Sequence, residues 1–168
     1  MSDSELNLRD FRCALSQFPT GVCVVTTRDC SGEPVGITAS SFNSVSIDPP
    51  LILWSIDKNI FSAKIFERSK NFAVNVLCQD QFDISNLFAK QGTDKFKGII
   101  FESGIGEVPL LQNCSAQFEC ESWNVYEGGD HLIIVGEVLN YRYVKENSPL
   151  VFACGSYAIH SQHPSVIC

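Results

Sequence analysis

The chain has 168 residues, a hydrophobic fraction of 45% and a formal net charge of −7. This length suits one domain with a sizeable core, and this hydrophobic fraction excludes an intrinsically disordered chain. The negative charge argues against nucleic-acid binding, which needs a basic surface. No apolar run is long enough to cross a membrane, and the N-terminus lacks the apolar segment of a signal peptide. We therefore expect a soluble cytoplasmic protein.

The chain contains eight cysteines, and none of them forms a C-x-x-C pair, so a zinc site is not expected. Cys168 ends the chain and is expected to be exposed. Three other cysteines occur in strand-like apolar patterns and are expected to be small buried hydrophobes: Cys23, Cys78 and Cys120. Without a secretion signal, the thiols are expected to be free.

In chain order, the first predicted element is a helix. Ser2 and Glu5 have the spacing of a capping box, and apolar residues recur at helical intervals from Phe11 to Phe18. Pro19 ends this helix. A strand over residues 22–27 and a glycine- and proline-containing turn over 29–34 follow.

Two further strands are predicted over residues 35–41 and 51–56, joined by a hydroxyl-rich turn. Asp48-Pro49-Pro50 between them continues neither helix nor strand, because proline lacks an N–H and fixes φ. Between the apolar runs lie four hydroxyls and one amide: Thr38, Ser40, Ser41, Ser44 and Asn43. Small side chains let backbone N–H groups approach a phosphate or the polar edge of a flavin ring. A turn that satisfies its own backbone explains these residues equally well.

Two short helices are expected in the middle of the chain. Asp57 or Asn59 would cap the first, which places Ser62 near a helix N-terminus that favours anions. Asp80 would cap the second. Residues 58–97 carry seven bases and four acids, a local charge of +3. An ordinary solvated helix face explains most of these lysines better than an anion site.

Strands alternate with loops through the rest of the chain. Strands are predicted over 72–77 and, half-buried, over 115–123, with an irregular segment over 99–109 between them. The longest strand runs from His131 to about Val144, with a bulge or bend at Gly136.

The last strand, over 150–159, is expected to be broken or kinked at Gly155. Closely spaced strands between Gly, Pro and Asp turns predict an antiparallel barrel or sandwich. No G-x-G-x-x-G follows a strand, so a Rossmann crevice is not expected.

Among the three histidines, His131 is the one to weigh, because His160 and His163 lie in a polar tail. His131 follows a tight glycine turn and opens a strand, which would place it at a barrel rim. With Asp130 beside it and a reference pKa of ~6.5, it could meet an anionic or amide-bearing ligand. A hydrogen bond to a neighbouring loop is the somewhat better explanation from chemistry alone.

Five segments, in order, carry a resemblance over nearly the whole chain: FPTGVCVVTT, GITASSFNSVSIDPPLILWSI, FAVNVL, YEGGDHLIIVGEV and PLVFACGSYAI. On these the chain resembles the flavin reductase-like family, the small reductase components of two-component flavin-dependent monooxygenases. The resemblance implies an all-β FMN-binding split barrel, a Greek-key antiparallel barrel with a few short helices, and a homodimer. It also implies that NADH or NADPH reduces FMN or FAD, and that a partner oxygenase acting on an aromatic or other small organic substrate receives the reduced flavin.

The resemblance further implies a set of site residues. Three segments would surround the flavin: one along the ring and phosphate arm, one near the ribityl and phosphate, and one turn close to the ring. Their residues are, in that order, Thr38, Ala39, Ser40 and Ser41; Ser55, Ile56, Phe61 and Ser62; and Pro19, Thr20 and Gly21. His131 would bind the nicotinamide and Tyr157 would close the site. Cys154 stands where relatives often carry a basic residue, which leaves the phosphate contacts and the cofactor preference open.

The prediction is a single domain over residues 1–168, with an N-terminal helix within 1–18 and a tail over 160–168. It would act as an NAD(P)H:flavin oxidoreductase without a metal or a catalytic side chain, because hydride transfer needs only two stacked rings. The alternative is a non-catalytic flavin- or haem-binding module, because a fold does not fix a function. The GGDH motif favours the enzyme, because a binding module needs no nicotinamide site.

Overall fold

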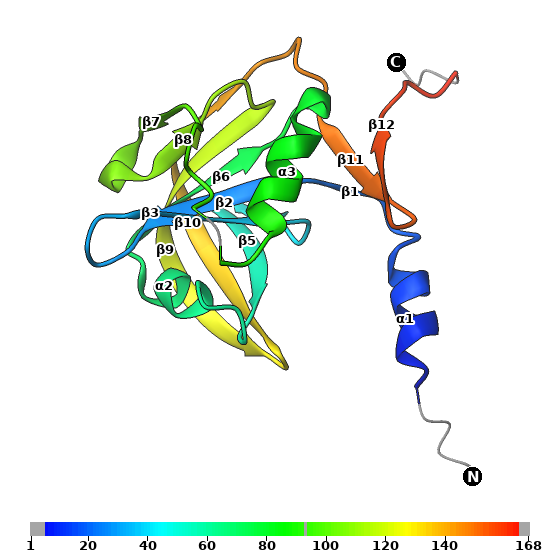
Figure 1. Cartoon of the computed structure of the whole chain (residues 1–168), viewed down its shortest axis with the longest axis horizontal. Helices are drawn as coiled ribbons and strands as arrows, with labels where there is room; N and C mark the ends of the chain where they lie inside the picture. Colours follow the sequence, from blue (N-terminus) through cyan, green and yellow to red (C-terminus); the bar gives the residue numbers. More distant parts are fainter. Residues whose placement is uncertain (1–5, 93, 165–168) are drawn as a thin grey trace.

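The computed structural model describes residues 6–92 and 94–164, and an antiparallel seven-stranded sheet is its main element (Figure 1). The sheet has the order β3-β2-β6-β9-β10-β5-β4 and curls on itself. Its strands, in chain order, are β2 (Cys23–Arg28), β3 (Pro34–Ala39), β4 (Asn43–Ile47), β5 (Pro50–Asp57), β6 (Asn71–Val76), β9 (Ala116–Gly128) and β10 (His131–Tyr143). The expected antiparallel barrel is confirmed.

The interior of the barrel is filled by side chains that alternate along the strands. On β5 the buried residues are Ile52, Trp54 and Ile56. The Trp54 ring meets Phe66 of α2 (Ala63–Arg68) edge to face at 4.9 Å, and α2 thereby covers one end of the barrel. The expected irregularity at Gly136 is confirmed as a shift in the β9–β10 register.

A small hairpin covers the outer face of β6 and β9, and the sequence did not indicate it. It consists of β7 (Phe101–Ser103), η2 (Ile105–Glu107) and β8 (Pro109–Leu111), within the segment expected to be irregular. The prediction that β9 is half-buried is wrong for this stretch, because the hairpin also buries Gln117 and Glu119 on the outward face. These side chains hydrogen-bond to neighbours: Gln117 Nε2 donates to Asn75 Oδ1 at 2.6 Å, and Glu119 Oε2 accepts from Ile105 N at 2.6 Å.

Both expected helix caps in the middle of the chain are wrong. The Asp57 carboxylate accepts from Asn59 N at 2.8 Å within a turn, and α2 starts only after Ser62. Asp80 lies inside η1 (Gln79–Gln81), where Cys78 N donates to Gln81 Oε1 at 3.0 Å. The second helix, α3 (Phe82–Ala89), follows η1 directly and packs outside β2 and β3.

The strand β4 was missed, because residues 43–47 alternate little and mostly expose their side chains. β4 forms a hairpin with β5, turned at Asp48–Pro49, with Pro50 as the first residue of β5. A proline is tolerated at the first position of a strand. The predicted turn between two strands therefore contains a third strand.

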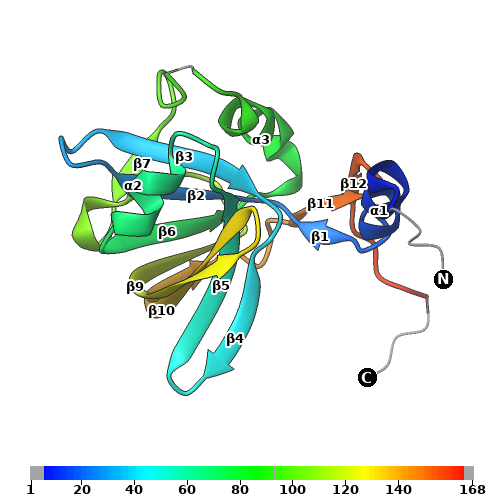
Figure 2. The same cartoon turned by 90° about the horizontal axis from the view of Figure 1, so that it is seen from below.

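A second, three-stranded sheet stands away from the barrel together with the N-terminal helix (Figures 1 and 2). The sheet has the order β1-β11-β12, from β1 (Thr20–Gly21), β11 (Leu150–Ala153) and β12 (Ser156–Ile159). We call this sheet and α1 (Leu8–Leu15) the arm. The predicted last strand is in fact the hairpin β11–β12, turned at Cys154 and Gly155, which have φ values of 50° and 76°.

The helix α1 is shorter than expected. Asn7 caps it, with Oδ1 accepting from Arg9 N at 3.0 Å and from Asp10 N at 3.3 Å. The helix ends at Leu15 rather than Phe18. The predicted capping box of Ser2 and Glu5 lies outside the described residues.

The seven described cysteines are free thiols, and the predicted burial of three of them is confirmed, whereas Cys168 lies outside the described residues. The buried thiols are those of Cys23, Cys78, Cys114 and Cys120. Within residues 6–92 and 94–164, no helix is long and apolar enough to cross a membrane.

Candidate functional site

A cavity of about 220 Å³ lies between the end of β3 and the end of β5. It brings together seven of the residues predicted for the site: Thr38, Ala39, Ser40, Ser41, Ser55, Ile56 and His131. Ile37, Trp54, Asp57 and Ile60 complete its lining. The two strands belong to opposite parts of the seven-stranded sheet, so the curling of the barrel creates this cavity.

Two hydroxyls of this cavity hydrogen-bond to backbone groups, and the ligand-binding role of this stretch stays a prediction. Ser41 Oγ accepts from Ser55 N at 2.9 Å and donates to Ser55 O at 3.0 Å, so it joins β5 to the turn after β3. Thr38 Oγ1 donates to Ser85 O of α3 at 2.6 Å. These two hydroxyls satisfy backbone groups of other elements. Ser40 is exposed, and its Oγ has no hydrogen-bond partner among the described residues.

His131 stands at the barrel rim, as expected, where β10 begins opposite Asp57 of β5. Its Nδ1 lies 2.7 Å from Asp130 Oδ1, and this hydrogen bond, with the charge of His131, lowers the pKa of Asp130. If Nδ1–H donates to that carboxylate, Nε2 of the neutral ring is an acceptor. Lys58 bonds Glu127 and Gly129 O and so ties the tip of the β9–β10 hairpin beside the cavity.

A larger cavity of about 650 Å³ adjoins the first and shares Ile37 and Ile60 with it. Phe61 and Ser62, predicted for the flavin arm, line this second cavity instead of the first. Residues 89–92 and 94–96 form its opposite wall, where Lys95 Nζ donates to Phe88 O at 2.7 Å and burial lowers the pKa of Lys95. Lys90, which has no such contact among the described residues, also lines it. The excess of basic over acidic residues in 58–97 is the feature of the sequence that corresponds to this wall.

Four predicted residues do not line either cavity. Pro19, Thr20 and Gly21 lie at β1, where Gly21 pairs with Val151 of β11. The Tyr157 hydroxyl reaches α3, 2.9 Å from Ser85 Oγ and 2.8 Å from Asn86 Oδ1. Tyr157 therefore contacts the helix that braces Thr38 and not the cavity itself.

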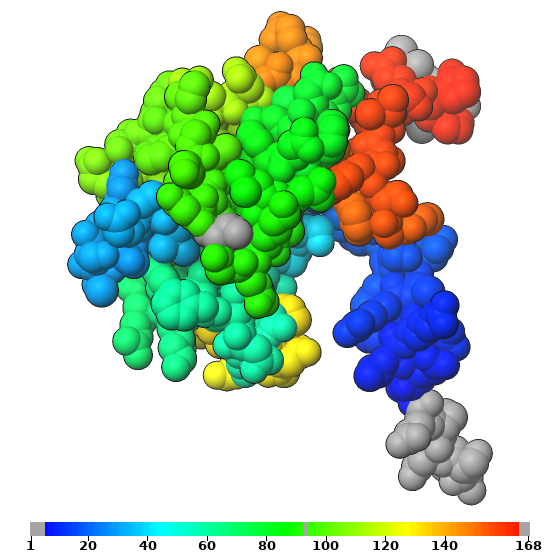
Figure 3. Space-filling view, viewed as in Figure 1, coloured from blue at the N-terminus to red at the C-terminus, as the bar shows by residue number. Residues whose placement is uncertain are grey.

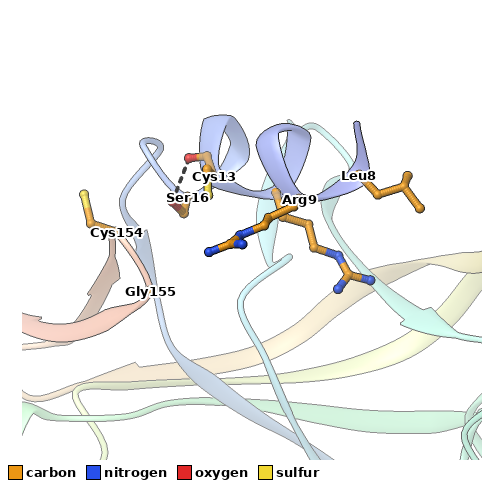
Figure 4. Close-up of a pocket in the computed structure, with 7 residues that line it drawn as sticks. Leu8, Arg9, Cys13, Ser16, Cys154 and Gly155 are labelled. Carbon is orange, nitrogen blue, oxygen red and sulfur yellow. Dashed lines mark hydrogen bonds between the residues drawn. The ribbon is translucent and has the colours of Figure 1, made fainter. Parts of the chain in front are cut away.

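Cys154 lines a different cavity of about 550 Å³, between α1 and the β11–β12 turn (Figure 4). Figure 4 shows the side chains of Arg9, Cys13 and Cys154 around this opening. The other lining residues are Leu8, Arg12, Ser16 and Gly155. None of these residues lines the cavities beside β3, so the position of Cys154 adds no phosphate contact there.

Trp54 is one of four residues lining the first cavity that were not predicted for the site. It lies in the apolar run LILWSI, which is typical of a core strand. Its indole Nε1 is buried without a hydrogen-bond partner, and no other buried side-chain nitrogen or oxygen among the described residues is in that position. An unpaired buried donor costs about 1–3 kcal/mol. The donor lies within the barrel core, so the cavity surface that would meet a flat ring with a polar edge is that of the exposed Ser40 hydroxyl and the apolar Ile37 and Ile60.

Comparison with known proteins agrees with a site for a flat ring with a polar edge. Residues 15–160 match the family described as flavin reductase like domain. The chain is 40% identical over 139 residues to the reductase component of a flavin-dependent trigonelline monooxygenase from Acinetobacter baylyi, covering 83% of this chain and 45% of that protein. It is 40% identical over 156 residues to an FMN reductase (NADH) from Agrobacterium fabrum, covering 93% of this chain and 88% of that protein. The chain thus spans less than half of the first relative and most of the second.

Among solved structures, an NADH:FAD oxidoreductase from Streptomyces globisporus, in complex with NAD and FAD fragments, superimposes with a TM-score of 0.86 at 33% identity. The superposition covers 98% of this chain and 100% of that chain. The expected split-barrel fold is thereby confirmed. The chain belongs to the flavin reductase like domain family.

Proposed function

We propose that the protein is an NAD(P)H:flavin oxidoreductase, which transfers a hydride from NADH or NADPH to FMN or FAD. The observation that carries this proposal is the cavity between β3 and β5, which gathers the hydroxyl-rich strand end and His131. The names of the relatives, a reductase component and an FMN reductase (NADH), support the same activity.

The flavin, when bound, supplies the hydride-accepting chemistry, and the protein residues supply position and electrostatics. Ile37, Ala39 and Ile56 line the cavity and would give the ring an apolar surface, and Ser40 with nearby backbone groups would meet its polar edge. Donors at that edge stabilise the negative charge of the reduced ring. His131 stands at the mouth of the cavity, where its Nε2 would meet the carboxamide of a nicotinamide stacked on the ring.

The larger cavity gives the flavin arm a place. Phe61 and Ser62 would contact its ribityl and phosphate. The same cavity is lined by two lysines, Lys90 and Lys95, and by three acids, Asp29, Glu33 and Asp94. A cavity of about 650 Å³ accommodates a phosphate or a longer nucleotide arm, so we propose that both FMN and FAD are accepted.

The test is to mix the purified protein with each nicotinamide cofactor and each flavin and to follow the loss of nicotinamide absorbance. We expect consumption of NADH or NADPH that depends on both protein and flavin. A protein that binds flavin without consuming the nicotinamide cofactor would be a binding module, and the proposal would be wrong.

We further propose that the protein is a homodimer whose arms embrace the second copy. The space-filling view shows the arm standing away from the barrel (Figure 3). No residue of α1 is buried, and Phe11 and Leu15 are 45% and 58% exposed. An eight-residue helix is marginal in water without packing of its apolar face. A second copy would supply that packing.

Light scattering tests the dimer directly. We expect twice the mass of the chain at micromolar concentration, and a monomer when Phe11 and Leu15 are both changed to Lys. Because neither side chain is part of the barrel core, far-UV circular dichroism should stay that of a folded barrel. A wild-type protein of monomer mass would overturn the proposal.

The other proposals concern partners and organisation. We propose that the reduced flavin passes, in the cytoplasm, to a partner monooxygenase that acts on an aromatic or other small organic substrate. The Acinetobacter relative is named as the reductase component of a trigonelline monooxygenase, which supports a partner of this kind. Residues 1–168 act as a single domain. Reconstitution with oxygenase components would test the transfer of reduced flavin. A single cooperative unfolding transition would support the single domain.

A further inference from the structure

Phe61 places a large aromatic ring at the larger of the two cavities. Its neighbours Ile60 and Ala63 pack into the barrel core, whereas Phe61 is 90% exposed. Single exposed apolar side chains are common on protein surfaces and need no explanation by themselves. What distinguishes Phe61 is its position, because it lines the cavity of about 650 Å³ that adjoins the cavity between β3 and β5.

The ring of Phe61 is not used by the packing of the protein. The other aromatic residue that lines the same cavity is Phe96, whose ring lies edge to face with Phe88 at 5.0 Å and with Phe101 at 5.4 Å. Phe61 has no such ring partner among the described residues and is largely exposed. A flat ligand group can therefore stack on Phe61 without displacing a contact of the core.

The size and the charges of the cavity indicate which flat group fits. The cavity has about three times the volume of its neighbour, so a phosphate arm fills only part of it. Two lysines in its lining suit a phosphate, but three acids outnumber them and would repel a second anionic group. Adenine is neutral, has a flat face for an aromatic ring and carries an amino group that donates to acceptors such as carboxylates. The acids are Asp29, Glu33 and Asp94, and the lysines are Lys90 and Lys95.

We propose that Phe61 is the stacking platform for an adenine base bound in the larger cavity. The inference rests on the proposed function and deepens it, because FAD and the nicotinamide dinucleotides carry this base and FMN does not. Stacking on an aromatic side chain holds a base by its face. Phe61 is therefore a specificity-determining residue, which favours ligands with an adenosine monophosphate unit over those without it.

The experiment compares ligands that differ by this unit alone. The dissociation constants for FAD and FMN are measured with the wild type, Phe61→Ala and Phe61→Trp, and their ratio cancels every contact that the two flavins share. With FMN as the flavin, kcat/KM is then measured for NADH and for reduced nicotinamide mononucleotide, which lacks the adenosine. Ile47→Ala is the matched control, because Ile47 is also 90% exposed and lines neither cavity.

The two ligand pairs distinguish the two sources of the base. If it belongs to the flavin, Phe61→Ala should weaken FAD about fivefold to 150-fold more than FMN, which is the loss of one base–aromatic stack. If it belongs to the nicotinamide dinucleotide, the same factor should appear between NADH and the mononucleotide. Phe61→Trp should keep the wild-type ratios, because the indole ring also stacks, and Ile47→Ala should leave both ratios unchanged.

Unchanged ratios for both ligand pairs in Phe61→Ala would overturn the inference, since Phe61 would then contact only the parts that the ligands share. The proposed function would still stand. An equal change in Ile47→Ala would overturn the inference as well, because the effect would not be specific to the cavity. A wild-type protein that neither binds a flavin nor consumes NADH or NADPH would instead refute the proposed function.

Discussion

The Ser41 hydroxyl closes the gap between β3 and β5, and its removal has a calculable effect. β4 pairs with β5 only as far as Asn43 opposite Leu53, so Ser55 of β5 lies beyond the end of that ladder. Ser41 Oγ takes the place of a backbone partner by bonding both Ser55 N and Ser55 O. The variant Ser41→Ala therefore leaves both groups of Ser55 unpaired on this side.

Each of the two hydrogen bonds contributes about 0.5–1.5 kcal/mol net, so we expect a loss of about 1–3 kcal/mol of unfolding free energy. For a chain of this size, 1 kcal/mol shifts the thermal midpoint by about 2–4 °C, so the expected decrease is about 2–12 °C. The same change loosens one wall of the cavity, so flavin affinity should decrease as well.

Urea denaturation followed by fluorescence, with thermal melts, measures the stability change, and Ser40→Ala is the matched control. Ser40 is the neighbouring hydroxyl without a protein partner, so its removal should change stability by less than about 0.5 kcal/mol. If Ser41→Ala and Ser40→Ala unfold at the same denaturant concentration, the Ser41 hydroxyl does not hold β5, and the reasoning is refuted.

Three further changes have definite expected outcomes. His131→Ala should lower kcat/KM for NADH about tenfold to a hundredfold through one lost hydrogen bond, with flavin affinity nearly unchanged; steady-state kinetics that show no change would mean that His131 does not meet the nicotinamide. Gly136→Ala should cost about 1–3 kcal/mol in a denaturant titration, because the new Cβ would overlap the Phe72 ring; unaltered stability would contradict the tight packing there. Burial raises the pKa of the thiols of Cys23, Cys114 and Cys120 to about 12. Maleimide at neutral pH should therefore leave these three thiols unlabelled in the native protein. Mass spectrometry should instead find the label on the exposed thiols of Cys13, Cys30 and Cys154. A label on any of the three buried thiols would disprove their inertness.

The parts of the fold that sequence could predict are those with strong local signals. The apolar run of β5, the glycine turn before His131 and the bulge at Gly136 each follow from periodicity or turn chemistry, and each lies where it was expected. The cavity could be anticipated to the same degree, because its hydroxyls lie at the end of one strand and face the next apolar run.

The missed features depend on contacts between distant segments. β4 has exposed side chains and becomes a strand only because β5 pairs with it. Trp54 resembles any core residue until the barrel is closed around its indole nitrogen. Tyr157 lies on a hairpin that turns at Cys154 and places its hydroxyl beside α3, an arrangement that the sequence did not indicate, while its role at the site stays a prediction. Local patterns contain no information on these three arrangements.

The polar side chains under the β7–β8 hairpin have a consequence for how the strands find their alignment. Asn75 faces Gln117 across β6 and β9, and Glu119 faces Asn140 across β9 and β10, and each pair is hydrogen-bonded. A slip of two residues would keep every apolar side chain on its own face, because side chains alternate with a period of two. It would, however, separate both pairs and leave polar atoms of the buried Asn75, Gln117 and Glu119 unpaired, at about 1–3 kcal/mol for each atom. These amides and this carboxylate therefore select one alignment among several that the apolar pattern alone permits.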